Sequence, residues 1–139
     1  MTGETSLATI IKTLRPHLND GDYVFCTLKD ESSARDLPVV GSFREAEGLT
    51  IIVERQVAEQ AGLAFDYVAA WITLNVHSAL QAVGLTAAFA TALGDAGVSC
   101  NVVAAYYHDH LFVGRKDADR AMEVLRDLSR TGEIPAIQM

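Results

Sequence analysis

The stretch from Ala79 to Leu128 decides the fold; it reads ALQAVGLTAAFATALGDAGVSCNVVAAYYHDHLFVGRKDADRAMEVLRDL. Apolar residues recur in it with two different periods, and these separate helices from strands. The first predicted element is a helix over 79–97, whose inward residues are Leu85, Ala88, Phe89, Ala92 and Leu93. A strand over 99–107, a tight polar turn His108-Asp109-His110 and a return strand over 111–113 follow as a hairpin. The last element is a helix over 117–130, whose inward residues are Ala121, Val124, Leu125 and Leu128.

The segments that flank this stretch complete the pattern. Residues 65–76 are rich in aromatic and β-branched side chains and predict a long strand. Residues 134–137 predict a last strand, in which Pro135 is tolerated only at a sheet edge. The second half therefore has the order strand–helix–strand–strand–helix–strand. This order predicts an α+β, ferredoxin-like (βαββαβ) fold, with an antiparallel sheet covered on one face by two helices.

The first half has a similar but less complete pattern. It begins with a predicted helix over 5–14, which has Leu7, Ile10, Ile11 and Leu14 on one face and is ended by Pro16. A turn over 19–22, a strand over 23–28 and a charged loop over 29–36 follow. Two further strands, over 39–43 and 49–53, lead into a helix over 54–62. This is the same order without its first strand. A weak internal duplication explains it, with an N-terminal half over 1–64 and a C-terminal half over 65–139.

Composition limits the classes of function. The chain has 139 residues, half of them apolar, and a net charge of −7 at a pI near 4.9. An acidic surface argues against binding to nucleic acid or to anionic membranes, because both need positive charge. Cys26 and Cys100 both lie in apolar runs, which favours buried, reduced thiols. We expect a cytoplasmic protein without a signal peptide or membrane span.

The quoted stretch resembles an ACT domain in four features that follow one another in the expected order. Residues 83–86 (VGLT) stand where the first ACT strand turns into the first helix. Residues 92–99 (ALGDAGVS) resemble the end of that helix, and 101–103 (NVV) the start of the second strand. Residues 111–113 with 117–128 resemble the third strand and second helix. The whole chain is similar to small bacterial proteins of unknown function built from two ACT-like halves.

The resemblance implies a function without catalysis. The paired ACT modules of aspartokinases and the arginine-sensing ACT proteins of animals are the nearest functional analogies. They imply a regulatory protein that binds a small molecule, an amino acid or another small carboxylate, and has no chemistry of its own. From the residues themselves we expect no cofactor and no metal. Because ACT modules commonly pair side by side into a continuous sheet, a homodimer is the expected assembly.

The predicted ligand site lies where the long strand passes into the following helix. A glycine allows close approach of the backbone, and the amide groups of the helix N-terminus suit a carboxylate. A polar amide at the start of the second strand can bind the same ligand. The predicted site residues are His77, Ser78, Gln81, Val83, Gly84, Leu85, Asn101 and Val102. The alternative is an ordinary strand–helix turn whose polar groups cap the helix.

Other interpretations remain open for several residues. His108 and His110 could hold a metal but are more simply a polar turn, because no third ligand is nearby in the sequence. Of Tyr106 and Tyr107, which alternate across a strand, one should face the core and the other a groove or partner. Trp71 should lie in the core or at a dimer interface.

Two alternative functions remain. One is a ligand-free module whose halves mediate protein pairing. The weaker one is a small hydrolase-type enzyme that uses His77 or Cys100. The sequence has no GxSxG motif and no phosphate-binding glycine loop, so neither a serine hydrolase nor a nucleotide cofactor is favoured.

Overall fold

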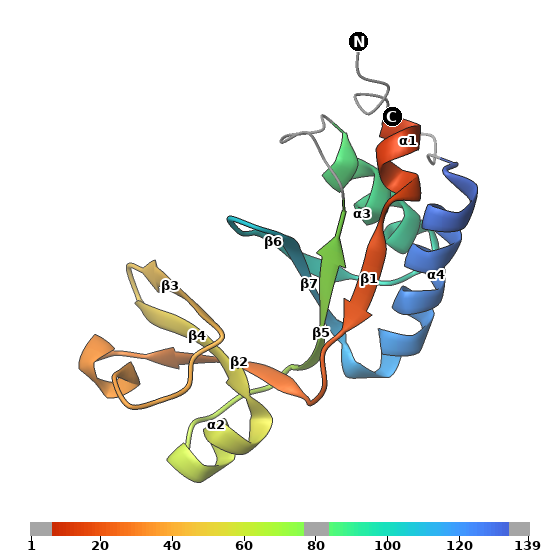
Figure 1. Ribbon diagram of the computed structural model, residues 1–139. Coiled ribbons are helices and arrows are strands. Elements are labelled where there is room, and N and C mark those ends of the chain that lie inside the picture. The colour runs from red at the N-terminus through yellow and green to blue at the C-terminus, as the bar shows by residue number, and fades with distance from the viewer. Residues whose placement is uncertain (1–6, 77–83, 134–139) are drawn as a thin grey trace. The chain divides into compact units, whose positions relative to one another are not determined.

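The computed structural model describes residues 7–76 and 84–133 and divides into two compact units (Figure 1). Unit 2 is Asp20–Ala70. Unit 1 joins the segments on either side of it, Met1–Asn19 and Trp71–Met139. This grouping differs from a linear division into 1–64 and 65–139, because the N-terminal segment makes its contacts with the C-terminal half of the chain.

Unit 1 is a four-stranded antiparallel sheet with helices. Its elements are α1 (Leu7–Lys12), β1 (Arg15–Leu18), the end of β5 (Val68–Asn75), α3 (Leu85–Asp95), β6 (Cys100–Ala104), β7 (Asp109–Gly114), a 3-10 turn η3 (Arg115–Asp117) and α4 (Ala118–Thr131). The strands lie in the order β1-β5-β7-β6. This is the strand order of a ferredoxin-like fold and confirms the predicted fold class.

The N-terminal segment supplies a strand that the sequence analysis missed. β1 pairs with β5 in antiparallel fashion, with Pro16 opposite Leu74. It therefore occupies the sheet position that the predicted strand over 134–137 was expected to fill; those residues lie outside the described part of the chain. The amide of Asn19 donates to the carbonyl of Trp71, so by alternation Pro16 presents its backbone away from β5. A proline fits there because its missing N–H is not needed for pairing.

Unit 2 has the same strand order with a reduced first helix. Its elements are β2 (Tyr23–Leu28), a 3-10 turn η2 (Glu31–Ala34), β3 (Gly41–Glu45), β4 (Gly48–Glu54), α2 (Arg55–Ala61) and the start of β5. The order is β3-β4-β2-β5. The expectation that this half lacks its first strand is therefore wrong. β2 is the first strand, and η2 stands in place of the first helix because KDESSARD has no apolar periodicity.

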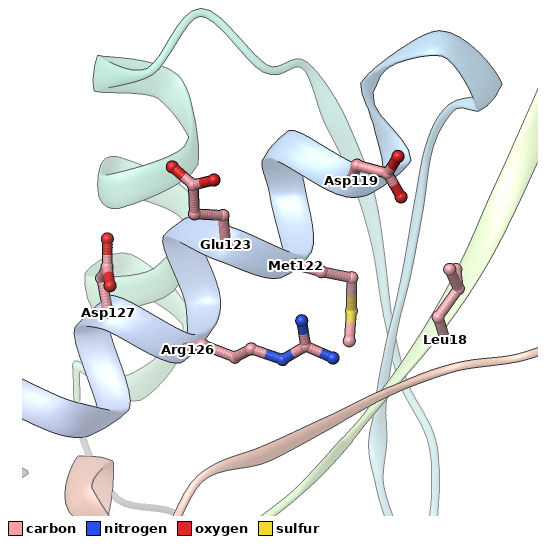
Figure 2. A pocket seen from close by; sticks show the side chains of 6 residues that line it. All are labelled: Leu18, Asp119, Met122, Glu123, Arg126 and Asp127. Carbon is pink, nitrogen blue, oxygen red and sulfur yellow. The ribbon is translucent and has the colours of Figure 1, made fainter.

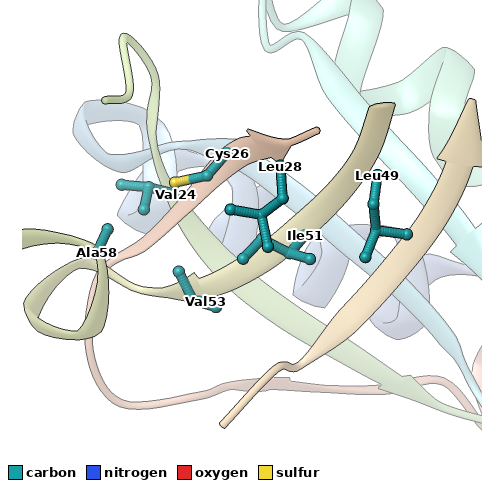
Figure 3. Close-up of a cluster of buried hydrophobic side chains, with 7 residues drawn as sticks. All are labelled: Val24, Cys26, Leu28, Leu49, Ile51, Val53 and Ala58. Carbon is teal, nitrogen blue, oxygen red and sulfur yellow. The ribbon is translucent and has the colours of Figure 1, made fainter. Parts of the chain in front are cut away.

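Each unit has its own apolar core. In unit 1 the fully buried side chains come from all layers: Ile10, Ile11, Leu14, Ile72, Leu74, Phe89, Leu93, Leu111 and Leu125. The amphipathic pattern of α4 is confirmed, although Met122 is buried where Val124 is only half-buried. Figure 3 shows the cluster of unit 2, formed by Val24, Cys26, Leu28, Leu49, Ile51, Val53 and Ala58.

The hairpin between β6 and β7 differs from the sequence-based expectation. The turn lies at 105–108, where the amide of Ala105 donates to the carbonyl of His108. His110 is therefore a strand residue and not part of the turn. Tyr106 is 92% exposed and Tyr107 84% exposed, so the expectation that one of them faces the core is wrong. Both belong to the turn, where the alternation of a strand no longer applies.

A truncation in the core of unit 2 provides a first test. Ile51 is fully buried in the cluster of Figure 3, so Ile51→Ala should lower the free energy of unfolding by about 2–5 kcal/mol. Phe43→Ala is the control, because Phe43 is 74% exposed and should change it by less than about 0.5 kcal/mol. Urea unfolding followed by circular dichroism measures both. Equal effects would contradict the assignment of this core.

Candidate functional site

Of the predicted ligand site, the structure describes Gly84, Leu85, Asn101 and Val102. Gly84 precedes α3 with a left-handed backbone, φ 92°, and its carbonyl accepts the first helical hydrogen bond, from the amide of Ala88 at 2.9 Å. Leu85 is buried at 8% exposure. The amides that open a helix have no partner inside it. The remaining predicted residues before the helix, His77, Ser78, Gln81 and Val83, lie outside the described residues.

Asn101 and Val102 lie on β6 and face opposite sides of the sheet. Asn101 is paired with Phe112 and is exposed, whereas Val102 is paired with Leu111, which is fully buried on the helix-covered face. Because side chains alternate along a strand, only one of the two can contribute its side chain to a single site. The polar amide of Asn101 is the one accessible to solvent.

Two glycines near the two ends of α3 test the backbone requirement at Gly84. A Cβ added at Gly84 would have an unfavourable φ and would lie 3.2 Å from Leu7 Cδ2. We expect Gly84→Ala to destabilise the protein by about 1 kcal/mol or more. Gly94, a helical residue with no atom within 4 Å of its added Cβ, should instead give about 0.5–1 kcal/mol of stabilisation as Gly94→Ala. Thermal unfolding measures the change in stability of both variants relative to the wild-type protein. Changes of the same sign in the two variants would contradict the backbone requirement at Gly84.

A polar network in unit 1 was not predicted from the sequence. Trp71 Nε1 donates to His110 Nδ1 at 3.0 Å, and Thr73 Oγ1 lies 3.1 Å from the same nitrogen. Asn19 Nδ2 donates to Thr73 Oγ1 at 3.0 Å and to the Trp71 carbonyl at 3.2 Å. Phe112 stacks on Trp71, with ring centroids 6.2 Å apart. Trp71 is thus half-buried and hydrogen-bonded, not a purely apolar core residue.

The network favours neutral His110. An indole nitrogen can only donate, so Nδ1 of His110 acts as an acceptor and the ring proton lies on Nε2. Burial lowers the pKa of His110, the neighbouring His108 lowers it further, and Asp109 partly opposes them. Protonation would place a hydrogen on the nitrogen at which Trp71 already points its own. The group therefore stabilises the folded state only while it is uncharged.

The sign of this effect predicts a loss of stability in acid. The pKa of His110 is lower in the folded than in the unfolded chain, where it is about 6.5. Its contribution is therefore complete above pH 6.5 and is lost as the pH falls through the folded-state pKa. Urea unfolding across this pH range measures how the free energy of unfolding depends on pH. His110→Gln should reduce this pH dependence, whereas the control variant His17→Gln, at an exposed strand position, should retain it. Retention in both variants would contradict the role of His110.

The thiols and histidines form no assembled catalytic or metal centre within the described ranges. Cys26 and Cys100 are free, and burial raises the pKa of both thiols, which disfavours the nucleophilic thiolate. The rings of His108 and His110 lie 6.4 Å apart, and no group of three metal-ligating side chains is found among residues 7–76 and 84–133. In the same part of the chain, no helix is long and apolar enough to cross a membrane.

A hollow of about 440 Å³ lies between α4 and β1, and Figure 2 shows the side chains that line it. It is lined by Leu18, Asp119, Met122, Glu123, Arg126 and Asp127. Arg126 also lines a second hollow of about 330 Å³, together with Arg15, Arg130, Ser129, Pro16 and Leu14. The sequence analysis missed this surface because it joins segments more than 100 residues apart.

Unit 2 carries a hollow of its own beside η2. It has a volume of about 570 Å³ and is lined by Glu31, Ser32, Ala34, Arg35, Leu37, Val39, Ser42, Leu49 and Ile51. Its floor is formed by apolar residues of β4. The hollow lies where a full first helix would cover the sheet in a ferredoxin-like unit, so it is a consequence of the reduced helix.

Two family models match the chain in tandem. Both describe an ACT domain, and they cover residues 2–70 and 67–127. The chain belongs to the ACT-domain family. The match over 2–70 contains the strands of unit 2, and the match over 67–127 contains β5, β6 and β7 of unit 1. The remaining strand of unit 1, β1, lies within the N-terminal match. A search of curated proteins found no match.

Solved structures support the same architecture. The chain is similar to a protein of unknown function from Vibrio cholerae, named as a possible transport protein: identity is 46%, the TM-score is 0.83, and the match covers 92% of this chain and 99% of that one. A protein from Agrobacterium tumefaciens is 19% identical, with a TM-score of 0.64 and coverage of 84% and 89%. The regulatory subunit of aspartate kinase from Thermus thermophilus is 8% identical, with a TM-score of 0.54 and coverage of 81% and 95%.

Proposed function

We propose that this ACT protein is a regulatory module that binds a small molecule, an amino acid, and has no catalytic activity of its own. The observation that carries the proposal is the tandem pair of ACT domains in a chain that spans 95% of an aspartate kinase regulatory subunit. ACT domains commonly bind amino acids in regulatory roles. The raised pKa of both cysteine thiols is a further argument against a cysteine enzyme.

In this proposal the ligand carboxylate binds at the N-terminus of α3. Gly84 has a left-handed backbone and no side chain, so a ligand can approach the first amides of the helix closely. The helix dipole favours a negative charge at this position. His77, Ser78, Gln81 and Val83 would surround the ligand before the helix, and Asn101 would bind its polar groups from β6. Binding would act by favouring one of two conformations or assemblies.

Homodimerisation belongs to the same proposal. Among the described strands β6 pairs only with β7, so its other edge is unpaired. Val103 on this strand is 44% exposed, and no charged residue or proline interrupts Cys100–Ala104. Unprotected edges of this kind pair with other strands. The same edge supports the second candidate function, a ligand-free pairing module. A cytoplasmic location, which keeps Cys26 and Cys100 reduced, is also part of the proposal.

A thermal-shift screen against the common amino acids and small carboxylates tests the proposed function. A ligand at 100 times its dissociation constant should stabilise the protein by roughly 2.7 kcal/mol, which raises the Tm by several degrees. Gly84→Asp should abolish this shift, because a carboxylate then occupies the anion position, while circular dichroism still reports a folded protein. An unchanged shift in the folded variant would contradict the site. No shift with any compound would favour the ligand-free pairing module.

A further inference from the structure

We propose that the hollow between α4 and β1 is a second binding site, and that its ligand is a zwitterionic amino acid with an aliphatic side chain. The inference rests on the proposed function for the general class of ligand. It uses none of the residues of the α3 site. Its basis is that an uncompensated guanidinium, uncompensated carboxylates and an apolar floor share one hollow (Figure 2).

Arg126 provides the anion-binding end. Neither an ion pair nor a hydrogen bond engages its guanidinium within the described residues. Glu123 and Asp127 also line the hollow, but no ion pair joins either of them to Arg126 within the described residues, and Asp127 is already paired with Arg130 at 3.1 Å. The adjoining hollow adds Arg15 to this end of the groove. In a chain with seven more acidic than basic residues, an arginine without a carboxylate partner is available for one from a ligand.

Asp119 provides the cation-binding end. It lies in the first turn of α4, and its carboxylate has no ion pair or hydrogen bond in the described ranges. Seven residues separate it from Arg126, about 10 Å along the helix axis. Side chains on a helix lean towards its N-terminus, so the long arginine side chain closes most of this distance. The remaining gap suits a single α-amino acid, whose ammonium and carboxylate groups are both attached to the α-carbon.

The floor between the two charged ends is apolar. Met122 is 4% exposed, and Leu18 of β1 is half-buried. Figure 2 shows Asp119, Met122 and Arg126 projecting towards the side on which Leu18 lies. A methionine side chain is flexible and adapts to irregular aliphatic groups. This arrangement selects against a simple anion or a simple cation, because either would leave one charged end of the hollow without a partner.

Isothermal titration of the full chain with L-leucine and L-methionine tests the site. N-acetyl-leucine, which lacks the ammonium group, and leucinamide, which lacks the carboxylate, should bind at least about tenfold more weakly than leucine, because each loses one charge-assisted contact. Arg126→Gln and Asp119→Asn should weaken leucine binding by a similar factor. Arg120→Gln is the matched control, since this exposed arginine of α4 lines neither hollow of the groove. It should leave the affinity unchanged.

The outcomes separate this inference from the proposed function. Loss of leucine binding in Arg126→Gln but not in Gly84→Asp supports the site between α4 and β1. Loss in Gly84→Asp with unchanged binding in Arg126→Gln overturns the second site and leaves the α3 site standing. Absence of leucine and methionine binding in the wild-type protein overturns the second site, and the wider ligand screen then decides the proposed function by itself.

Discussion

The antiparallel pairing of β1 with β5 is the contact on which the organisation of unit 1 depends. Four residues, Arg15–Leu18, complete its sheet and hold the N-terminal segment beside the C-terminal half of the chain. This pairing brings α1 against α4, and Ser129 of α4 donates to the Leu14 carbonyl at 2.8 Å. The guanidinium of Arg15 donates hydrogen bonds to the carbonyls of Lys12 and Leu14. Without β1, β5 would have an unpaired edge over Ile72–Asn75, and the hollow beside Leu18 would not exist.

β5 links the two ferredoxin-like orders. Its first residues pair with β2 in unit 2, and its last four pair with β1 in unit 1. The strand therefore serves as the fourth strand of one unit and the first of the other. This explains why the ACT matches overlap at residues 67–70, and why a chain of 139 residues can contain two such orders.

The two faces of the sheet in unit 1 have different chemistry. Ile72, Leu74, Leu111 and Val113 point to the helices and are almost fully buried. On the other face Trp71, Thr73 and His110 form a hydrogen-bonded network whose buried polar atoms are all satisfied within the described residues. A satisfied polar cluster of this kind is specific in geometry, and it requires an uncharged imidazole. The network thus couples one sheet face to the protonation of a single histidine.

Local signals in the sequence were sufficient for most elements. The α+β ferredoxin-like class, α4 with its apolar stripe, α2 ended by Gly62, β2 and the left-handed Gly97 after α3 all follow from periodicity and capping, which depend on neighbouring residues only. The left-handed backbone of Gly84 was not predicted, because the periodicity placed this residue inside a helix over 79–97, whereas α3 begins at Leu85. The predicted α3 site depended on a local signal too, and Gly84, Leu85, Asn101 and Val102 remain its described candidates.

Contacts between distant segments were decided by the tertiary structure. Pro16 predicted only the end of a helix, because its fit to a sheet edge depends on which side of the strand β5 occupies. The Trp71–His110 bond joins residues 39 apart, and the hollow of Figure 2 joins Leu18 to α4. The sequence by itself determined most of the helices and strands, with β1 as the exception. Only the tertiary structure decided which strand completes each sheet and which charges meet, because both depend on chain segments whose separation carries no local pattern.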